Sequence, residues 1–169
     1  MAKKTTHRVV KYHPERSSWE SIQGSIMRIE RAAFGTRAYA RTLLQEAFTN
    51  LRNVIVVVQS QKGRIAGYAY AQLGSKYNSK KRSVAYLESI ALLPSLRGKK
   101  LGGKMISKLE QDLRKQGVRT LELDAKVCNG FAKRIEEYNR SHGRPVLKSY
   151  THNSPWGKQK FLRFHINCG

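Results

Sequence analysis

The stretch ESIALLPSLRGKKLGGKMISKL, residues 88–109, joins a run typical of a strand to a run typical of a helix. Between the two runs the chain places Pro94, three glycines and four cationic side chains. The first N–H groups of a helix have no partner within it, and the positive end of the helix dipole lies there. Glycine lets the backbone approach a ligand without an intervening Cβ. The stretch therefore predicts a site for an anion, which we expect to be a phosphate.

The residues expected to surround this anion lie in one short segment. They are Arg97, Gly98, Lys99, Lys100, Leu101, Gly102, Gly103 and Lys104. The segment is not a G-x-x-x-x-G-K-[ST] loop, because Met105 stands where that loop requires Ser or Thr, and it does not contain the G-x-G-x-x-G motif. A glycine-rich helix start on a basic protein, with no ligand, is the alternative interpretation.

Apolar spacing predicts the order of elements along the rest of the chain. Residues 17–35 are expected to form a helix, because Ser17 and Glu20 form a capping box and isoleucines follow at spacings of three and four. Further helices are expected at 37–50, 101–117 and 129–143, and strands at 7–12, 53–60, 64–74, 84–93, 118–127, 145–150 and 160–166. This order predicts a mixed α/β domain built on one central sheet.

Length and charge set the broad class of the protein. The 169 residues contain no linker or repeat, so we expect a single domain, 1–169. Lys and Arg number 33 against 11 Asp and Glu, which gives a formal net charge of +22. Such an excess attracts polyanions, so nucleic acid, the ribosome and acidic proteins are candidate partners. The alternative is a charged surface that only keeps the protein soluble.

The sequence also bears on location and on metals. No apolar run approaches the roughly 20 residues that span a bilayer, and the start MAKKTTHRVVKY lacks the apolar core of a secretory signal. Cys128 and Cys168 are far apart and form no C-x-x-C pair, which fits a reducing compartment and argues against a zinc site. We therefore expect a cytoplasmic protein with no metal site and no membrane contact.

The opening stretch resembles the acetyl-CoA-binding core of the GNAT superfamily of N-acetyltransferases. That motif reads Arg or Gln, two residues, Gly, one residue, then Gly or Ala, and Arg97 and Gly102 occupy its first and last positions. Lys100 stands where the family has its middle glycine, and a tight left-handed turn is expected to strain it. Upstream, Ile90, Ala91, Leu92 and Pro94 match the apolar-Ala-apolar-x-Pro pattern of the preceding strand.

The resemblance covers roughly residues 19–165. RIERAAF, residues 28–34, is similar to the first-helix segment of the family, and NGFAKRIEEY, residues 129–138, is similar to its Asn-x-x-Ala-x-x-apolar-Tyr segment. The family tyrosine position holds Glu136, and Tyr138 follows two residues later. The resemblance implies a single-domain GNAT-like α/β fold, with a mixed sheet of about six to seven strands flanked by about four helices.

The resemblance implies acetyl-CoA as cosubstrate and no metal. The turn at residues 97–104 is then expected to wrap the diphosphate, and the backbone of Ile90, Ala91 and Leu92 to pair with pantetheine. Asn129 is expected either to contact the cofactor or only to cap its helix.

The implied reaction is direct attack of an amine on the thioester in a ternary complex. Glu88 is the expected general base, because it precedes Ile90 by two on a strand and so shares its face; the alternative is a Glu that only binds the ammonium. Glu30 is a weaker candidate for the base, because a Glu on the first helix can serve only to orient a loop. Tyr138 is the expected acid, with Tyr150 as the alternative. No Cys nucleophile is needed, so Cys128 is expected to serve in packing.

Two functions remain in competition at this point. The first is an N-acetyltransferase that acts on a primary amine of a macromolecule, either a protein Lys or N-terminus or an aminoacyl-tRNA, since a +22 protein repels free polyamines. The second is a catalytically weak or inactive module of the same fold that binds nucleic acid through its basic surface.

Overall fold

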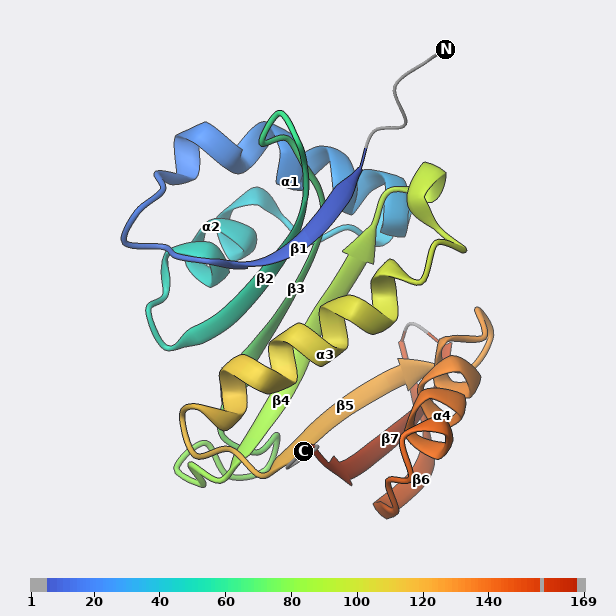
Figure 1. Cartoon of the computed structure of the whole chain (residues 1–169). Helices are drawn as coiled ribbons and strands as arrows, with labels where there is room; N and C mark the ends of the chain where they lie inside the picture. Colours follow the sequence, from blue (N-terminus) through green and yellow to red (C-terminus); the bar gives the residue numbers. More distant parts are fainter. Residues whose placement is uncertain (1–5, 156, 167–169) are drawn as a thin grey trace. The chain divides into compact units, whose positions relative to one another are not determined.

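The computed structural model describes residues 6–155 and 157–166; Cys168 lies outside these ranges. Within them, seven strands and four α-helices follow in the predicted order (Figure 1). The strands are β1 (His7–Tyr12), β2 (Asn53–Ser60), β3 (Ile65–Leu73), β4 (Val84–Leu92), β5 (Thr120–Lys126), β6 (Val146–Ser154) and β7 (Gly157–His165). The helices are α1 (Trp19–Phe34), α2 (Arg41–Thr49), α3 (Leu101–Arg114) and α4 (Phe131–Ser141), with short 3-10 turns at Gly35–Arg37 and Pro94–Leu96. The predicted mixed α/β fold is confirmed.

The strands form one mixed sheet in the order β1-β2-β3-β4-β5-β7-β6. β1 and β2 are antiparallel, β4 and β5 are parallel, and β7 is antiparallel to both β5 and β6. The chain packs as two compact units, which we call unit 1 (Met1–Ala71 and Glu88–Asp112) and unit 2 (Gln72–Leu87 and Leu113–Gly169).

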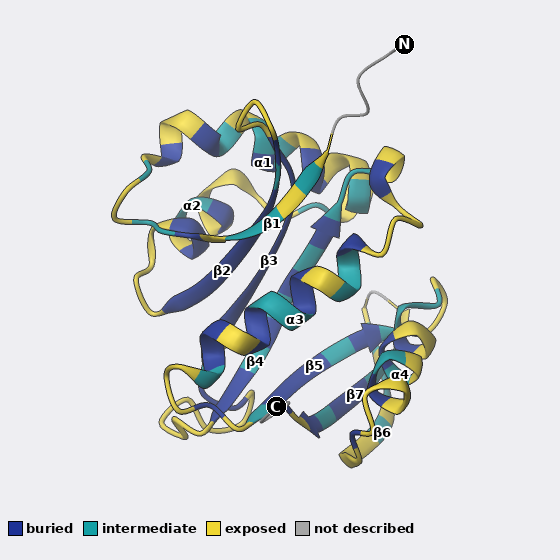
Figure 2. Cartoon of the chain, viewed as in Figure 1, coloured by how far each residue is buried: buried dark blue, intermediate teal, exposed yellow. Residues whose placement is uncertain are grey.

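Unit 1 is held together by an aromatic and aliphatic core. Ile26 and Ile29 of α1 and Phe48 of α2 pack with Ile55 of β2 and Tyr68 of β3, and all five are almost fully buried. The rings of Phe48 and Tyr68 meet edge to face at a centroid distance of 5.4 Å. Figure 2 shows β2 as a buried strand, as its continuous β-branched run predicts.

The ends of the first two helices differ in detail from the prediction. Ser18, not Ser17, is the N-cap of α1, and its hydroxyl accepts the Ser21 N–H at 3.3 Å. Gly35 ends the helix with a φ of 58°, as predicted. The second helix begins at Arg41, because Gly35–Arg37 forms a 3-10 turn.

Unit 2 is built around β5. The parallel ladder pairs Val84–Leu87 of β4 with Thr120–Leu123 of β5, and every residue of β5 pairs with β7 on its other side. α4 packs on β5 and β7, where Leu121, Leu123 and Phe164 are fully buried. β6 forms the edge of the sheet and is exposed or half-buried throughout. No helix among the described residues has the length and apolarity needed to cross a bilayer.

Candidate functional site

The turn between β4 and α3 has the geometry of an anion cradle. Gly98 has a φ of 75° and Lys100 a φ of 60°; Lys100 is the one non-glycine residue with positive φ among the described residues. The carbonyl of Lys100 accepts the Lys104 N–H at 3.3 Å, so α3 begins directly after this left-handed residue. The N–H groups of the first helical turn therefore have no acceptor within α3.

The strain predicted for Lys100 is confirmed by its left-handed backbone. A side chain in this conformation costs about 1 kcal/mol relative to glycine, because Cβ approaches the following carbonyl. Buried Leu96 and Leu101 anchor the chain on either side of this turn.

The residues of this turn fit a diphosphate. A Cβ added at Gly98 or Gly102 would meet no heavy atom within 4 Å, so the space beside both backbones is open. Arg97, Lys99 and Lys104 are exposed around the same turn. The turn thus combines open backbone, helix N–H groups and positive charge. The Leu101 side chain is buried in the core, so this residue can contact an anion only through its backbone.

The end of β4 places the predicted pantetheine-binding residues. Ala91 is 4% exposed and belongs to the core of unit 1, whereas Ile90 and Leu92 are half-buried. Glu88 shares the half-buried pattern of Ile90, as the two-residue period predicts. Gly67 allows β3 to approach closely here, since a Cβ at that position would lie 2.7 Å from Leu92 Cδ1.

The charge of Glu88 acts on two tyrosines of unit 1. Burial raises the pKa of Tyr39, and the nearby charges of Glu88 and then Glu30 raise it further. Burial likewise raises the pKa of Tyr70. The charges of Tyr39, Glu88 and Glu30 raise this pKa further. The structure therefore brings the two candidate carboxylates near the same phenols.

Glu30 is a buried carboxylate that anchors the chain ahead of α2. Its side chain accepts the Tyr39 N–H at 2.8 Å and the Tyr68 hydroxyl, and that hydroxyl lies 3.4 Å from the Ser89 hydroxyl. Burial raises the pKa of Glu30, although both hydrogen bonds oppose the rise. These contacts fit the predicted role of Glu30 in orienting a loop.

The predicted residues around α4 lie in unit 2. Gly130, not Asn129, is the N-cap, but the Asn129 side chain accepts the Phe131 N–H at 3.0 Å and so still satisfies the helix start. Cys128 is exposed, so the expectation that it packs in the core is wrong. Its position in the turn before α4, beyond the buried part of β5, explains the exposure.

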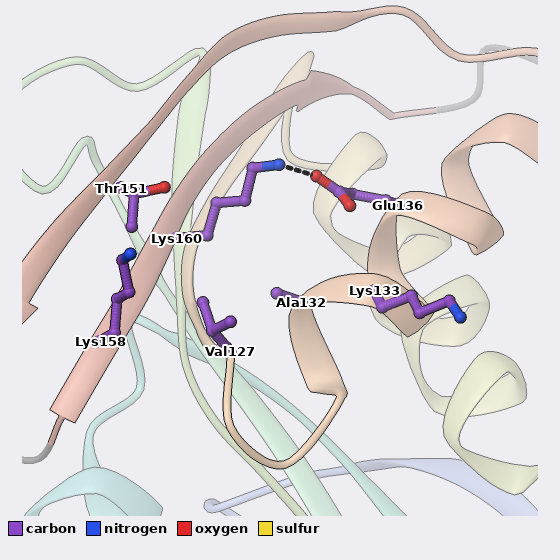
Figure 3. A pocket seen from close by; sticks show the side chains of 7 residues that line it. All are labelled: Val127, Ala132, Lys133, Glu136, Thr151, Lys158 and Lys160. Atoms are coloured by element: carbon purple, nitrogen blue, oxygen red, sulfur yellow. Dashed lines mark hydrogen bonds and ion pairs between the residues drawn. The ribbon is translucent and has the colours of Figure 1, made fainter.

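Glu136 and Tyr138 point to different surroundings. Glu136 pairs with Lys160 of β7 in a pocket formed by α4, β6 and β7 (Figure 3). The Tyr138 ring lies 4.1 Å from the His142 ring and 5.1 Å from the Arg144 guanidinium, near the end of the helix. The two-residue displacement therefore gives Tyr138 neighbours that differ from those of the family position.

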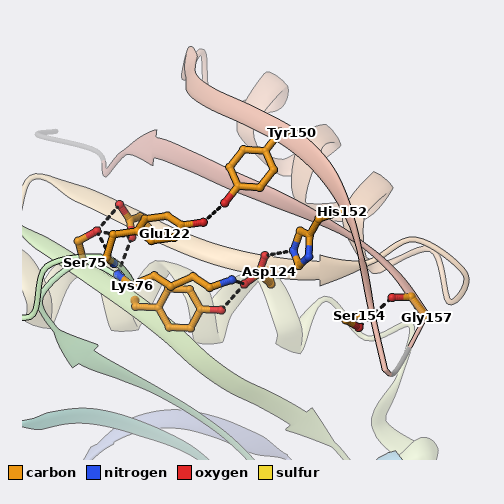
Figure 4. Close-up of polar contacts among 10 residues, drawn as sticks. Ser75, Lys76, Glu122, Asp124, Tyr150, His152, Ser154 and Gly157 are labelled. Carbon is orange, nitrogen blue, oxygen red and sulfur yellow. Dashed lines mark hydrogen bonds and ion pairs between the residues drawn. The ribbon is translucent and has the colours of Figure 1, made fainter.

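The opposite face of the unit 2 sheet carries a polar network that the sequence analysis missed (Figure 4). The Asp124 side chain is 8% exposed and accepts hydrogen bonds from Lys76, from Tyr86 at 2.6 Å and from His152 at 2.7 Å. Burial would raise the pKa of Asp124, but these three donors hold it below its usual range. Alternation along β5 places Asp124 and Glu122 on one face, which was the available signal.

Two further features belong to this face. Fully buried Glu122 accepts the Ser75 hydroxyl at 2.9 Å, the Lys76 N–H at 2.9 Å and the Arg163 Nε–H at 2.7 Å. Tyr150, the alternative acid, hydrogen-bonds Tyr77 and stacks on Phe161 at 4.9 Å.

Among the described residues, no group of three or more His, Cys, Asp or Glu is placed to hold a metal ion.

Comparisons with known proteins identify the family. The profile of the Acetyltransferase (GNAT) family matches residues 19–143. The chain matches no curated protein significantly in sequence.

Solved structures share the fold. The chain is similar to the ribosomal-protein-S18-alanine N-acetyltransferase from Escherichia coli, with 17% identity, 97% of this chain and 96% of that chain covered, and a TM-score of 0.69. It is similar to Ard1 from Thermoplasma volcanium, with 15% identity, 95% and 98% covered, and a TM-score of 0.70. It is also similar to a phosphinothricin acetyltransferase from Sinorhizobium meliloti in complex with AcCoA, with 19% identity, 97% and 90% covered, and a TM-score of 0.71.

Proposed function

Because the chain belongs to the GNAT family of acetyltransferases, and is therefore an N-acetyltransferase, we propose that it acetylates a primary amine on a macromolecule with acetyl-CoA. The observation that carries the cosubstrate is the turn from Arg97 to Lys104, with its positive φ at Gly98 and Lys100 and its open space at Gly102. A structural neighbour that holds AcCoA supports the same cosubstrate.

The turn binds the cofactor through backbone and charge. The N–H groups at the start of α3 donate to diphosphate oxygens, and Arg97, Lys99 and Lys104 neutralise their charge. The backbone of Ile90, Ala91 and Leu92 pairs with the pantetheine arm, and the amides after Ile90 donate to the thioester oxygen. Asn129 is the cofactor contact proposed in unit 2. Acetyl-CoA supplies an activated acetyl group at this point.

Proton transfer is assigned to side chains of the chain itself. A Lys amine has a pKa near 10.4 and is charged at neutral pH, so a base must remove one proton before it attacks. Glu88 is the proposed base, directly or through water, because it lies two residues before Ile90 on the same face of β4. Tyr138 is the proposed proton donor to the leaving thiolate, with Tyr150 as the alternative.

A macromolecular acceptor is supported by charge. The net charge of +22 repels free polyamines and steers acidic proteins, ribosomes and RNA toward the enzyme. Two neighbours point the same way, since one is named as a ribosomal-protein N-acetyltransferase and another as Ard1. A third is named as a phosphinothricin acetyltransferase, so small acceptors belong in any test.

An acceptor panel tests the proposal. Acetyl transfer from labelled acetyl-CoA is measured with ribosomal proteins, N-terminal peptides, aminoacyl-tRNA and spermidine at two salt concentrations. We expect the highest kcat/KM for a macromolecular acceptor, and a rate that falls as salt screens the attraction. A preference for spermidine would overturn the acceptor class. RNA binding without transfer to any acceptor, and without binding of acetyl-CoA, would instead support the nucleic-acid-binding alternative.

A further inference from the structure

One ammonium group of the chain sits in unusual surroundings in unit 2. Lys76 follows β3, and its Nζ pairs with Asp124 of β5 (Figure 4). The same nitrogen lies 5.8 Å from the ring centroid of Tyr77, 6.0 Å from that of Tyr86 and 5.9 Å from that of Phe161. A carboxylate and three aromatic rings therefore surround one alkylammonium group.

This combination is a receptor for alkylammonium ions. The faces of aromatic rings attract cations, and the attraction strengthens as water is excluded. A carboxylate adds a charge-assisted hydrogen bond. With the Asp124 side chain only 8% exposed, the ammonium binds beside a partly desolvated anion.

The receptor does not depend on Lys76 for its shape. The Tyr86 hydroxyl and His152 Nε2 both hydrogen-bond Asp124, at 2.6 and 2.7 Å, and so hold the carboxylate in place. Stacking of Tyr150 on Phe161 at 4.9 Å fixes the third ring of the receptor.

The Lys76 side chain can leave without unfolding its loop. The loop backbone is fixed by buried Glu122, which accepts the Lys76 N–H and the Ser75 hydroxyl, both at 2.9 Å. The Lys76 side chain itself is 33% exposed. Rotation about its side-chain bonds is therefore enough to expose the Asp124 carboxylate to another ammonium.

The carboxylates of unit 2 are few, and each already has a cationic partner. Unit 2 contains sixteen Lys and Arg against four Asp and Glu. Each of these four carboxylates pairs with a Lys or Arg. A cationic acceptor amine that binds one of these carboxylates must therefore replace a cation of the chain.

We propose that Asp124, Tyr77, Tyr86 and Phe161 form the site that recognises the primary ammonium of the acceptor, and that Lys76 fills this site until the acceptor displaces it. The inference rests on the proposed acetyltransferase function and adds to it the residues that select the amine. Lys76 acts as an internal competitor, so its removal should strengthen binding of the acceptor.

Steady-state kinetics with the best acceptor of the panel test this directly. Lys76→Ala should lower the KM for the acceptor, by about tenfold if Lys76 fills the site about nine-tenths of the time, and leave the KM for acetyl-CoA unchanged. Asp124→Asn should raise the acceptor KM. Lys80→Ala, on the same loop and with the same loss of charge, is the matched control and should change neither KM. An unchanged or raised acceptor KM in Lys76→Ala, in a protein that still folds, would overturn the proposal.

A binding experiment separates this inference from the proposed function. The Lys76→Ala protein, without acetyl-CoA, is titrated with n-propylammonium, which replaces the missing part of the Lys side chain, and amide and aromatic NMR shifts are followed. We expect saturable shifts at Tyr77, Tyr86 and Phe161 that require about tenfold more n-propylammonium in wild type and are absent in the Lys76→Ala, Asp124→Asn double variant. No saturable shifts in the folded Lys76→Ala protein would refute the receptor even if acetyl transfer is observed. Saturable shifts in a protein that acetylates no amine would retain the receptor and refute only the function.

Discussion

The carbonyl of Lys100 accepts the N–H of Lys104 at 3.3 Å, so α3 begins from a lysine held in the left-handed region. The same residue stands where the family motif has glycine. The first turn of α3 thus combines a strained backbone with two cationic side chains at the place where we propose that a diphosphate binds. The strain at Lys100 lowers folding stability, whereas its charge favours binding of the diphosphate. Substitutions at this position separate the two effects.

Replacement of Lys100 by Gly should raise the free energy of unfolding by up to about 1 kcal/mol, because glycine adopts a φ of 60° without a Cβ clash. Urea denaturation measures this change, and calorimetry with acetyl-CoA measures affinity in the same protein. Lys99→Gly is the matched control and should lower stability, since glycine there adds only freedom to the unfolded chain. Equal effects of the two substitutions on stability would contradict the strain.

The Gly102→Ala variant should retain its stability and lose affinity for acetyl-CoA. A Cβ at Gly102 meets no heavy atom of the protein within 4 Å, and alanine favours the helix more than glycine does. Any loss of binding therefore arises from a methyl group placed where the diphosphate approaches. Thermal unfolding measures the stability of the variant, and calorimetry measures its affinity for acetyl-CoA. A variant that binds acetyl-CoA as tightly as wild type would exclude Gly102 from the proposed cradle.

The Glu88→Gln variant should lose about 10²- to 10⁴-fold in kcat with its affinity for acetyl-CoA retained, because a missing general base slows only proton transfer. Glu46→Gln, on the exposed face of α2, is the control and should remain fully active. The rate is measured from pH 6 to 9, since loss of a base also removes the limb of the profile that depends on it. If the variant and wild type share one profile and one kcat, Glu88 is not the base.

Periodicity predicted most of the fold. The spacing of Ile22, Ile26 and Ile29 predicted α1, and these residues are buried as expected. The β-branched run of β2 predicted a strand covered on both faces. Helix starts were less accurate, because neighbouring serines compete at α1 and because Gly130 adopts the capping position that Asn129 was expected to take. Such choices depend on local backbone angles that a spacing pattern does not contain.

The local part of the candidate site was also accessible from sequence, whereas its long-range part was not. The turn at residues 97–104 is contiguous, so its glycines and lysines could be interpreted together. Asp124 accepts hydrogen bonds from Lys76, Tyr86 and His152, which lie in three separate segments of the chain. Their proximity follows from strand order and register, which link β5 to β4 and, through β7, to β6. Neither order nor register can be derived from composition.

Asp124 should give the folding stability a specific dependence on pH. Its pKa is lowered in the folded protein, where Lys76, Tyr86 and His152 outweigh the effect of burial. A carboxyl whose pKa is lowered on folding stabilises the protein fully above its unfolded pKa, about 3.9 for Asp, and loses this contribution as pH falls through the folded value. The difference in unfolding free energy between wild type and Asp124→Asn should therefore be present at pH 5 and shrink below about pH 4. Urea denaturation from pH 3 to 7 measures it, with Glu137→Gln, a half-exposed carboxyl on α4, as control. A difference that stays constant from pH 5 to pH 3 would show that Asp124 contributes through its shape and not through its charge.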